Sequence, residues 1–208
     1  MNAPEPVGEP AASPGRRPRA PSMVRVLPLL VAAAVVLLHA VAGARQWPVV
    51  VQGVLDEPAH LLTAWLVLAA LPGDLLERSL GRWALVASVA IDLDHIPLYL
   101  SDYEFSVDGR PPTHGLALVC AVLAIAAALR GRHRERAFGI GLGVALHLVR
   151  DLATGPGVPL LWPVYDSAVR VPQAAYLITV VAVAVVAAAR RPGPHPGNRR
   201  RGARGSTS

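Results

Sequence analysis

Six apolar runs constrain the fold of this chain more than any other feature of its sequence. They cover approximately residues 24–43, 58–72, 83–100, 114–129, 137–152 and 172–189. About 20 apolar residues span a bilayer as a helix, and local thinning or flanking anchors accommodate shorter runs. Because 53% of the residues are hydrophobic and only 16% are charged, we predict an all-α, polytopic membrane bundle of about six transmembrane helices. Five spans are the alternative, if the run at 58–72 only re-enters the membrane.

The two ends of the chain differ in composition from the region between them. Residues 1–22 and 191–208 are rich in Pro, Gly, Ala and Arg and have no apolar period, so we expect disordered cytoplasmic tails. The transmembrane domain is then residues 23–190. Its first run could instead be a signal peptide, but its apolar stretch is longer than the roughly 7–15 residues of a signal core. That length favours an uncleaved anchor.

The positive charges predict an orientation. All 20 are arginine, and 16 of them fall on one side if the N-terminus is cytoplasmic and six spans alternate. Cytoplasmic loops of membrane proteins carry this excess, so we predict a bacterial inner-membrane protein with both termini in the cytoplasm. Topology and attraction to anionic lipid then explain the excess of positive over negative charges. Membrane lipid is the expected partner, nucleic acid is not, and the oligomeric state is left open.

Histidines and carboxylates gather at the ends of four runs, all on the predicted outer side. Ionisable residues in membrane spans are costly and are functional candidates by default. The second and fourth runs begin on this side, and the third and fifth end there. The residues at these ends are Asp56, Glu57 and His60, then Asp92, Asp94 and His95, then His114, and finally His147, Arg150 and Asp151. The arginines and the ionisable clusters thus support the same topology independently.

Helical spacing places several of these side chains on shared faces. His147 and Asp151 are four residues apart, and Glu57 and His60 are three apart, so each pair shares one side of its helix. Pro58 is then expected in a first helical turn.

The third run carries a second such pair, Asp92 and His95. Asp94 lies about 200° from Asp92 on a regular helix of about 3.6 residues per turn. It joins the pair only if the helix loosens before Pro97. Otherwise Asp94 is expected to orient a histidine from outside the ligand set.

Imidazoles and carboxylates from four helices are typical ligands of zinc, or of a pair of metals, and manganese and iron also suit them. The single cysteine, Cys120, lies in an apolar run and is not expected to take part. A bound metal would activate water at near-neutral pH. We predict Glu57 or Asp94 as the general base and Arg150 as the residue that holds a substrate anion such as phosphate. The predicted metal ligands are His60, Asp92, His95, His114, His147 and Asp151.

Other interpretations use the same residues differently. His39, His133 and His195 are typical interfacial polar residues, although His39 lies on the side of the cluster. Asp56 is interpreted as a helix cap. A non-enzymatic metal-binding sensor or transporter would need a polar path through the inner halves of the spans, and those of the fourth and sixth runs are almost wholly Ala, Val, Leu and Ile. A purely structural polar cluster would bind no metal.

At these residues the sequence resembles the YdjM-like inner-membrane-associated proteins, a family described as metal-dependent hydrolases. The resemblance rests on Asp92-Leu93-Asp94-His95, on Thr113-His114, and on residues 147–163 (HLVRDLATGPGVPLLWP), with His60 as an early histidine. It covers about residues 56–165. Two features depart from the family pattern. A tail and a full span precede His60, and Pro111-Pro112 stands where Arg and Gly are expected.

The resemblance implies a metal-dependent hydrolase and leaves its substrate open. A site at the outer membrane interface favours lipid-linked or envelope substrates, such as phosphoesters or esters. We therefore expect a hydrolase that acts at the extracytoplasmic face.

Overall fold

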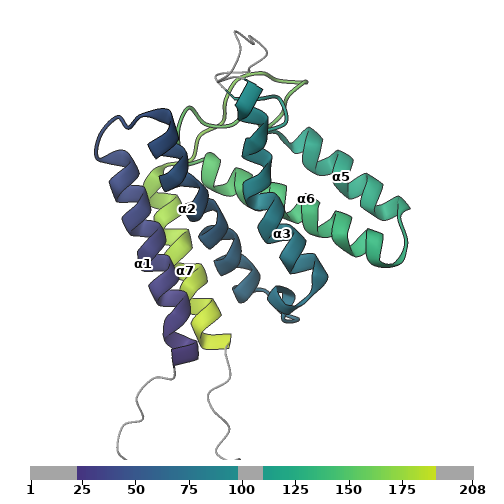
Figure 1. Cartoon of the computed structure of the whole chain (residues 1–208), viewed down its shortest axis with the longest axis horizontal. Coiled ribbons are helices and arrows are strands. Elements are labelled where there is room, and N and C mark those ends of the chain that lie inside the picture. The colour runs from purple at the N-terminus through teal and green to yellow at the C-terminus, as the bar shows by residue number, and fades with distance from the viewer. Residues whose placement is uncertain (1–22, 98–109, 191–208) are drawn as a thin grey trace, which may run out of the picture.

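The computed structural model describes residues 23–97 and 110–190 (Figure 1). The predictions for the two tails, and for His195, lie outside these residues. The described ranges are all-α, as predicted, with two short 3-10 helices, η1 (Leu75–Glu77) and η2 (Ile91–His95). Their six α-helices are α1 (Met23–Gly43), α2 (Val49–Ala70), α3 (Ser79–Ala90), α5 (Leu116–Ala128), α6 (Gly131–Asp151) and α7 (Gln173–Arg190).

The start of α2 is the largest departure from the predicted helices. The helix begins at Val49, so Pro58 lies in its interior, and the prediction that Pro58 occupies a first turn is wrong. Asp56 is also inside α2 and does not cap it, contrary to our interpretation. The carboxylates of Asp56 and Glu57 face a polar cluster formed by other helices, and the helix therefore continues through them. With 22 residues, α2 is about 33 Å long at 1.5 Å per residue.

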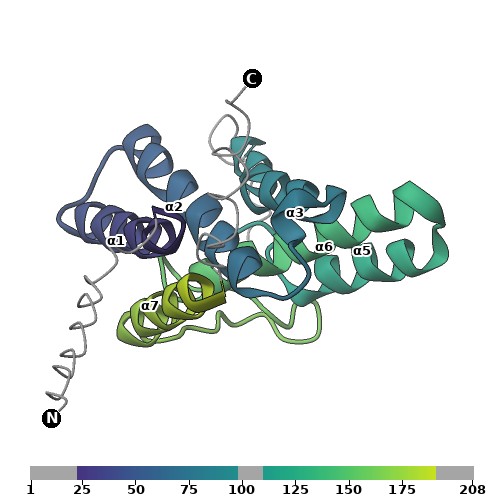
Figure 2. The same cartoon turned by 90° about the horizontal axis from the view of Figure 1, so that it is seen from below.

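The helices pack as two groups of three that meet along α2. In one group, α1, α2 and α7 contact one another, and in the other α6 packs between α3 and α5. Helix α2 joins the groups through contacts with α3 and α6 (Figures 1 and 2). The buried contacts are mainly aliphatic, with Val35, Leu66 and Val180 in the first group and Val119, Val144 and Leu148 in the second.

Glycines bring α3 and α6 into close contact. Gly139 and Gly143 lie one turn apart on α6, and an added Cβ at either position would collide with a backbone carbonyl of α3, that of Leu80 or Ala84. Small residues at this spacing let helix backbones approach each other in membrane proteins. His147 follows Gly143 by one further turn, so this contact fixes where His147 stands relative to α3.

We expect Gly143→Ala to lower the free energy of unfolding by about 1–3 kcal/mol, as overpacking in close-packed interiors does. The measurement is thermal or denaturant unfolding in detergent. Gly53→Ala is the matched control, because Gly53 lies inside α2 with no atom within 4 Å of an added Cβ. Alanine there should be neutral or stabilise by up to about 1 kcal/mol through helix propensity. Equal stabilities of the two variants would contradict close packing at Gly143.

Within residues 23–97 and 110–190, two helices are long and apolar enough to cross a membrane by length and composition, Arg25–Gly43 within α1 and Gln173–Arg190, which is α7. Helix α5 is apolar but shorter, at Leu116–Ala128. The count of six spans therefore stays a prediction for the other helices.

One end of the bundle collects the segments that carry the ionisable clusters. The C-terminal ends of α1, α3 and α6 lie there together with the N-terminal ends of α2, α5 and α7, at the top of Figure 1. The connection from α6 to α7 crosses this end, and a single β-bridge joins Val158 to Val169 within it. The same connection holds the start of α5 through a backbone hydrogen bond from Leu116 to Leu160 at 2.9 Å.

Candidate metal centre

Four histidines from four segments meet at this end of the bundle. His60 comes from α2, His95 ends η2, His114 precedes α5, and His147 comes from the last turns of α6. The rings of His60 and His147 stack with centroids 3.9 Å apart. The ring of His114 stands edge-on to those of His147 and His95, at 5.1 Å and 4.8 Å. The structure thus brings together all four histidines that were predicted as ligands.

The carboxylate of Asp92 lies among three of these rings. Its Oδ1 is 3.0 Å from Nε2 of His114, 3.3 Å from Nε2 of His147 and 3.4 Å from Nδ1 of His95. One oxygen atom therefore faces imidazoles from three different segments.

The carboxylate of Asp151 occupies the deeper side of the cluster and is fully buried. Its Oδ2 is 2.9 Å from Nε2 of His147, one turn earlier on α6, and its Oδ1 is 3.4 Å from Nε2 of His60. The Nη1 atom of Arg110 lies 2.7 Å from Oδ2. Asp151 is therefore held between two candidate ligands and one permanent positive charge.

Asp94 joins the cluster because the chain tightens where it leaves α3. Residues 91–95 form a 3-10 helix with three residues per turn. Asp92 and Asp94 therefore lie about 120° apart around the helix axis. On a regular α-helix they would be about 160° apart, which is the angle of about 200° measured the shorter way. The Oδ1 atom of Asp94 is 3.0 Å from Nδ1 of His95, and its Oδ2 is 3.4 Å from Nδ1 of His114. The hydroxyl of Thr113 donates a hydrogen bond to the same carboxylate.

Several buried atoms of the cluster make no hydrogen bond of good geometry among the described residues, although some of them lie close to oppositely charged groups. They are both ring nitrogens of His60, Nε2 of His147, Nδ1 of His114, both carboxylate oxygens of Asp151, Oδ1 of Asp94 and Oε2 of Glu57. Buried polar atoms are otherwise almost always paired. A bound cation would supply the missing partner, and imidazole nitrogens with carboxylate oxygens are ligands of zinc and related metals.

The distances between donor atoms also fit a metal ion. One ligand atom each from Asp92, Asp94, His95 and His114 lie within 4.8 Å of one another, and the same holds for His60, His147 and Asp151. His147 is already oriented, because its Nδ1 is 2.9 Å from the carbonyl oxygen of Ser88. An N–H directed to that carbonyl leaves Nε2 free to bind a metal.

Arg150 belongs to a second polar network beside the histidines. Its side chain is 1% exposed. Its Nε donates to Oδ1 of Asp56 at 2.8 Å, and its Nη1 donates to the hydroxyl of Tyr176 at 3.3 Å. The other oxygen of Asp56 is 3.6 Å from Nε2 of His60. Arg150 thus connects α6 to α2 and α7, and it acts on His60 through Asp56.

Tyr176 belongs to this network through its hydroxyl group. The sequence did not indicate this role, because Tyr176 lies in an apolar run. Its hydroxyl is 2.7 Å from that of Thr63 and also accepts from Arg150. We expect Tyr176→Phe to cost about 1–3 kcal/mol of stability, because it leaves buried polar partners unsatisfied. Tyr165→Phe is the control, since Tyr165 is 54% exposed, and it should unfold like the unmodified chain in detergent. No difference between the two variants would show that the buried bonds contribute nothing.

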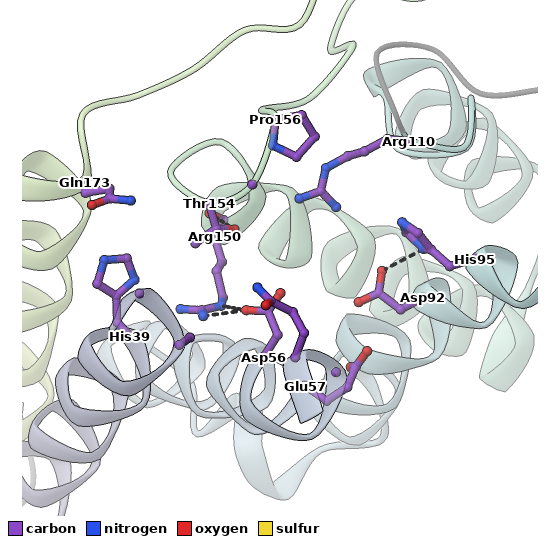
Figure 3. Close-up of a pocket in the computed structure, with 15 residues that line it drawn as sticks. His39, Asp56, Glu57, Asp92, His95, Arg110, Arg150, Thr154, Pro156 and Gln173 are labelled. Atoms are coloured by element: carbon purple, nitrogen blue, oxygen red, sulfur yellow. Dashed lines mark hydrogen bonds and ion pairs between the residues drawn. The ribbon is translucent and has the colours of Figure 1, made fainter. Parts of the chain in front are cut away.

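A cavity of about 360 Å³ opens beside the cluster (Figure 3). Glu57, Asp92 and His95 line it on the cluster side, and Arg110 and Arg150 line its middle. His39 and Gln173, from α1 and α7, line its far side. The structure thus places His39 at the cavity rather than at an isolated interface, whereas His133 is an exposed residue near the start of α6.

Arg110 is the main residue of the site that sequence reasoning missed. From the sequence alone, it is one of the four arginines that fall outside the predicted cytoplasmic segments. It is buried, its Nη1 pairs with Asp151, and its Nε donates to the carbonyl of Gly157 at 2.8 Å. Its place directly before Pro111-Pro112-Thr113-His114 was the available signal.

The fold and the site define a helical membrane protein with a buried cluster of His and Asp residues that could hold a divalent metal. The sequence model of the YdjM inner membrane protein family matches residues 29–206. The chain therefore belongs to the YdjM inner membrane protein family. Searches of curated proteins and of solved structures found no match.

Proposed function

We propose that this protein is a membrane-bound, metal-dependent hydrolase with its site at the extracytoplasmic face, and that it acts on lipid-linked or envelope phosphoesters or esters. One observation carries the proposal. A buried set of imidazole nitrogens and carboxylate oxygens, several of which make no hydrogen bond of good geometry among the described residues, adjoins a cavity of about 360 Å³. Ligand sites of enzymes typically have volumes of about 300–1,000 Å³.

The predicted ligands His60, Asp92, His95, His114, His147 and Asp151 would hold the ion, and zinc suits this donor set best, with manganese or iron as alternatives. When bound, such an ion supplies Lewis-acid activation of water and of the ester or phosphoester group.

Glu57 is the residue best placed to accept a proton in the cavity. It lines the cavity beside Asp92, and its Oε2 has no hydrogen-bond partner among the described residues. Asp94, the other predicted base, is already bonded to Thr113 and faces two histidines. This difference supports Glu57 as the general base and Asp94 as a residue of the ligand set.

Two arginines make the cavity suitable for an anionic substrate. Arg150 was the predicted anion-binding residue, and it lines the cavity while paired with Asp56. Arg110 lines the same cavity, and its Nη2 lies next to Gly155. We propose that Arg110 contacts the substrate anion directly and that Arg150 contributes positive potential and holds Asp56.

Exposed apolar side chains support a membrane location for helices beyond α1 and α7. Leu37 of α1, Val86 of α3, Ile125 of α5 and Ile178 of α7 are all more than half exposed. Soluble proteins rarely expose such side chains in contiguous patches. We propose that six helices are embedded, with both termini cytoplasmic as the arginines predict. A green fluorescent protein fused to the C-terminus should fluoresce, and an alkaline phosphatase fused there should be inactive. The reverse pattern would overturn the orientation.

The test of activity uses purified protein in detergent, loaded with zinc or manganese. We expect hydrolysis of at least one member of a panel of chromogenic phosphoesters, esters and lipid-linked phosphates. Glu57→Gln should lower the turnover number by about 100-fold or more, as loss of a general base does, and should still bind metal. Metal binding without hydrolysis across the panel would count against the enzyme and favour a sensor or transporter.

A further inference from the structure

The ligand cluster divides into two donor sets that share no residue. The first set, here called the α3 set, is Asp92, Asp94, His95 and His114, and the second, the α6 set, is His60, His147 and Asp151. Within each set the donor atoms lie within 4.8 Å of one another. Three protein ligands are enough to hold a catalytic zinc ion. Each set therefore has the composition of a complete metal site.

Resting on the proposed function, we propose that this centre holds two divalent ions, one in each set, and that the carboxylates of Asp92 and Asp151 lie between them. The contacts across the boundary support this arrangement. Oδ1 of Asp92 is 3.3 Å from Nε2 of His147, and Oδ2 of Asp151 is 3.7 Å from Nε2 of His114. Each carboxylate thus faces an imidazole of the other set, and a carboxylate has two oxygens with which to serve two ions.

The number of donors exceeds what one ion can use. The cluster offers seven side chains, whereas zinc in proteins is almost always bound by about four ligands or fewer. A single ion in the α3 set would leave the buried donor atoms of His60, His147 and Asp151 without a cation. A single ion in the α6 set would leave the four carboxylate and imidazole pairs of the α3 set without a cation.

The charges at the site also favour two divalent ions. In the part of the chain that the structure describes, two arginines, Arg110 and Arg150, lie beside the carboxylates of Asp56, Glu57, Asp92, Asp94 and Asp151. When the imidazoles bind metal as neutral ligands and all five carboxylates are ionised, three negative charges remain for the bound ions to balance. Buried charges are costly near lipid, and one divalent ion would still leave the site negative. Two ions make it positive, which suits an anionic substrate in the adjoining cavity.

Two ions would also narrow the substrate class. Paired metal ions are typical of enzymes that hydrolyse phosphate esters, because two cations balance the charge on the attacking and the leaving oxygen. Arg110 and Arg150 add two fixed positive charges along the same cavity. The two-ion centre therefore favours phosphoesters over neutral carboxylic esters.

The test is a titration of metal-free protein in detergent with Mn²⁺, followed by electron paramagnetic resonance and elemental mass spectrometry. We expect two ions per chain at saturation, and a spectrum broadened by coupling between neighbouring ions. His95→Ala, in the α3 set, and His60→Ala, in the α6 set, should each retain one ion with the spectrum of isolated Mn²⁺. His39→Ala is the control, because His39 lines the cavity outside both sets, and it should retain two coupled ions.

One ion per chain in the saturated wild type would overturn the two-ion centre, and this result does not depend on how any variant folds. Loss of all metal in both single variants, with folding verified by thermal unfolding, would also overturn it by indicating one shared site. The proposed function fails separately. Hydrolysis with one bound ion would leave the hydrolase intact, and two coupled ions without hydrolysis would leave the centre intact.

Discussion

Replacing His147 with alanine is expected to weaken divalent-metal binding by at least about 100-fold, because even residues that only orient metal ligands typically contribute about 10–100-fold to affinity. The Nε2 atom of His147 faces both Asp92 and Asp151, and its Nδ1 is fixed by the carbonyl of Ser88. No other imidazole of the cluster faces both carboxylates so closely. Competition against a chromophoric chelator in detergent measures the change in affinity.

His133→Ala is the matched control for this variant. His133 lies on the same helix, α6, and is exposed at its opposite end. Its replacement should leave metal affinity unchanged. If His147→Ala bound metal as tightly as His133→Ala, the cluster would not be a metal centre of the kind described.

Replacing Arg150 with methionine is expected to cost about 3–5 kcal/mol of stability, the usual effect of removing one partner from a buried ion pair. The guanidinium of Arg150 is 1% exposed and bonds to Asp56 and Tyr176. Methionine retains much of its length but leaves Asp56 without its cation. The measurement is unfolding in detergent, by heat or by denaturant.

Arg78→Met provides the comparison, because Arg78 pairs with Glu135 at 3.8 Å and is 56% exposed. Exposed pairs contribute about 0–1 kcal/mol, so this variant should unfold close to the unmodified chain. The double variant Arg150→Met/Asp56→Leu should regain part of the lost stability by removing the unpaired carboxylate. Equal costs for Arg150→Met and Arg78→Met would refute the structural role of Arg150.

The helical class and the gathering of the site could both be predicted from the sequence. The apolar runs located all six described helices, because each helix packs an apolar surface against its neighbours. Alternation of the runs then placed His60, His114 and His147 at one end, since antiparallel neighbours bring every second connection to the same side. This required no knowledge of which helices touch.

The predictions that failed or were missed concern polar residues whose partners lie elsewhere in the bundle. Asp56 and Pro58 predict the start of a helix, yet α2 begins at Val49. Asp56 lies inside the helix and has a partner in Arg150 across the bundle. Such a pairing depends on tertiary contacts between residues 94 positions apart. Tyr176 and Arg110 were not predicted as site residues for the same reason. Their partners, Thr63 on α2 and Asp151 on α6, are distant in the sequence.

The position of Asp94 shows how local geometry decided a choice that the sequence left open. A regular helix would have turned its carboxylate away from Asp92. The 3-10 turn at 91–95 brings it against His95 and His114 instead. The close packing of α6 on α3 at Gly139 and Gly143 has a comparable effect, because it sets the carbonyl of Ser88 against the ring of His147. Backbone packing thus positions the ligands of the centre.

A metal centre at the extracytoplasmic face is tested most directly by removing metal from oriented membranes. Sealed right-side-out and inside-out vesicles that contain the metal-loaded protein are treated with the membrane-impermeant chelator EDTA, and the protein is then purified and its metal counted. We predict that the right-side-out vesicles lose most of their bound metal and that the inside-out vesicles keep it. Metal lost only from inside-out vesicles, or protein without metal in both, would contradict the account.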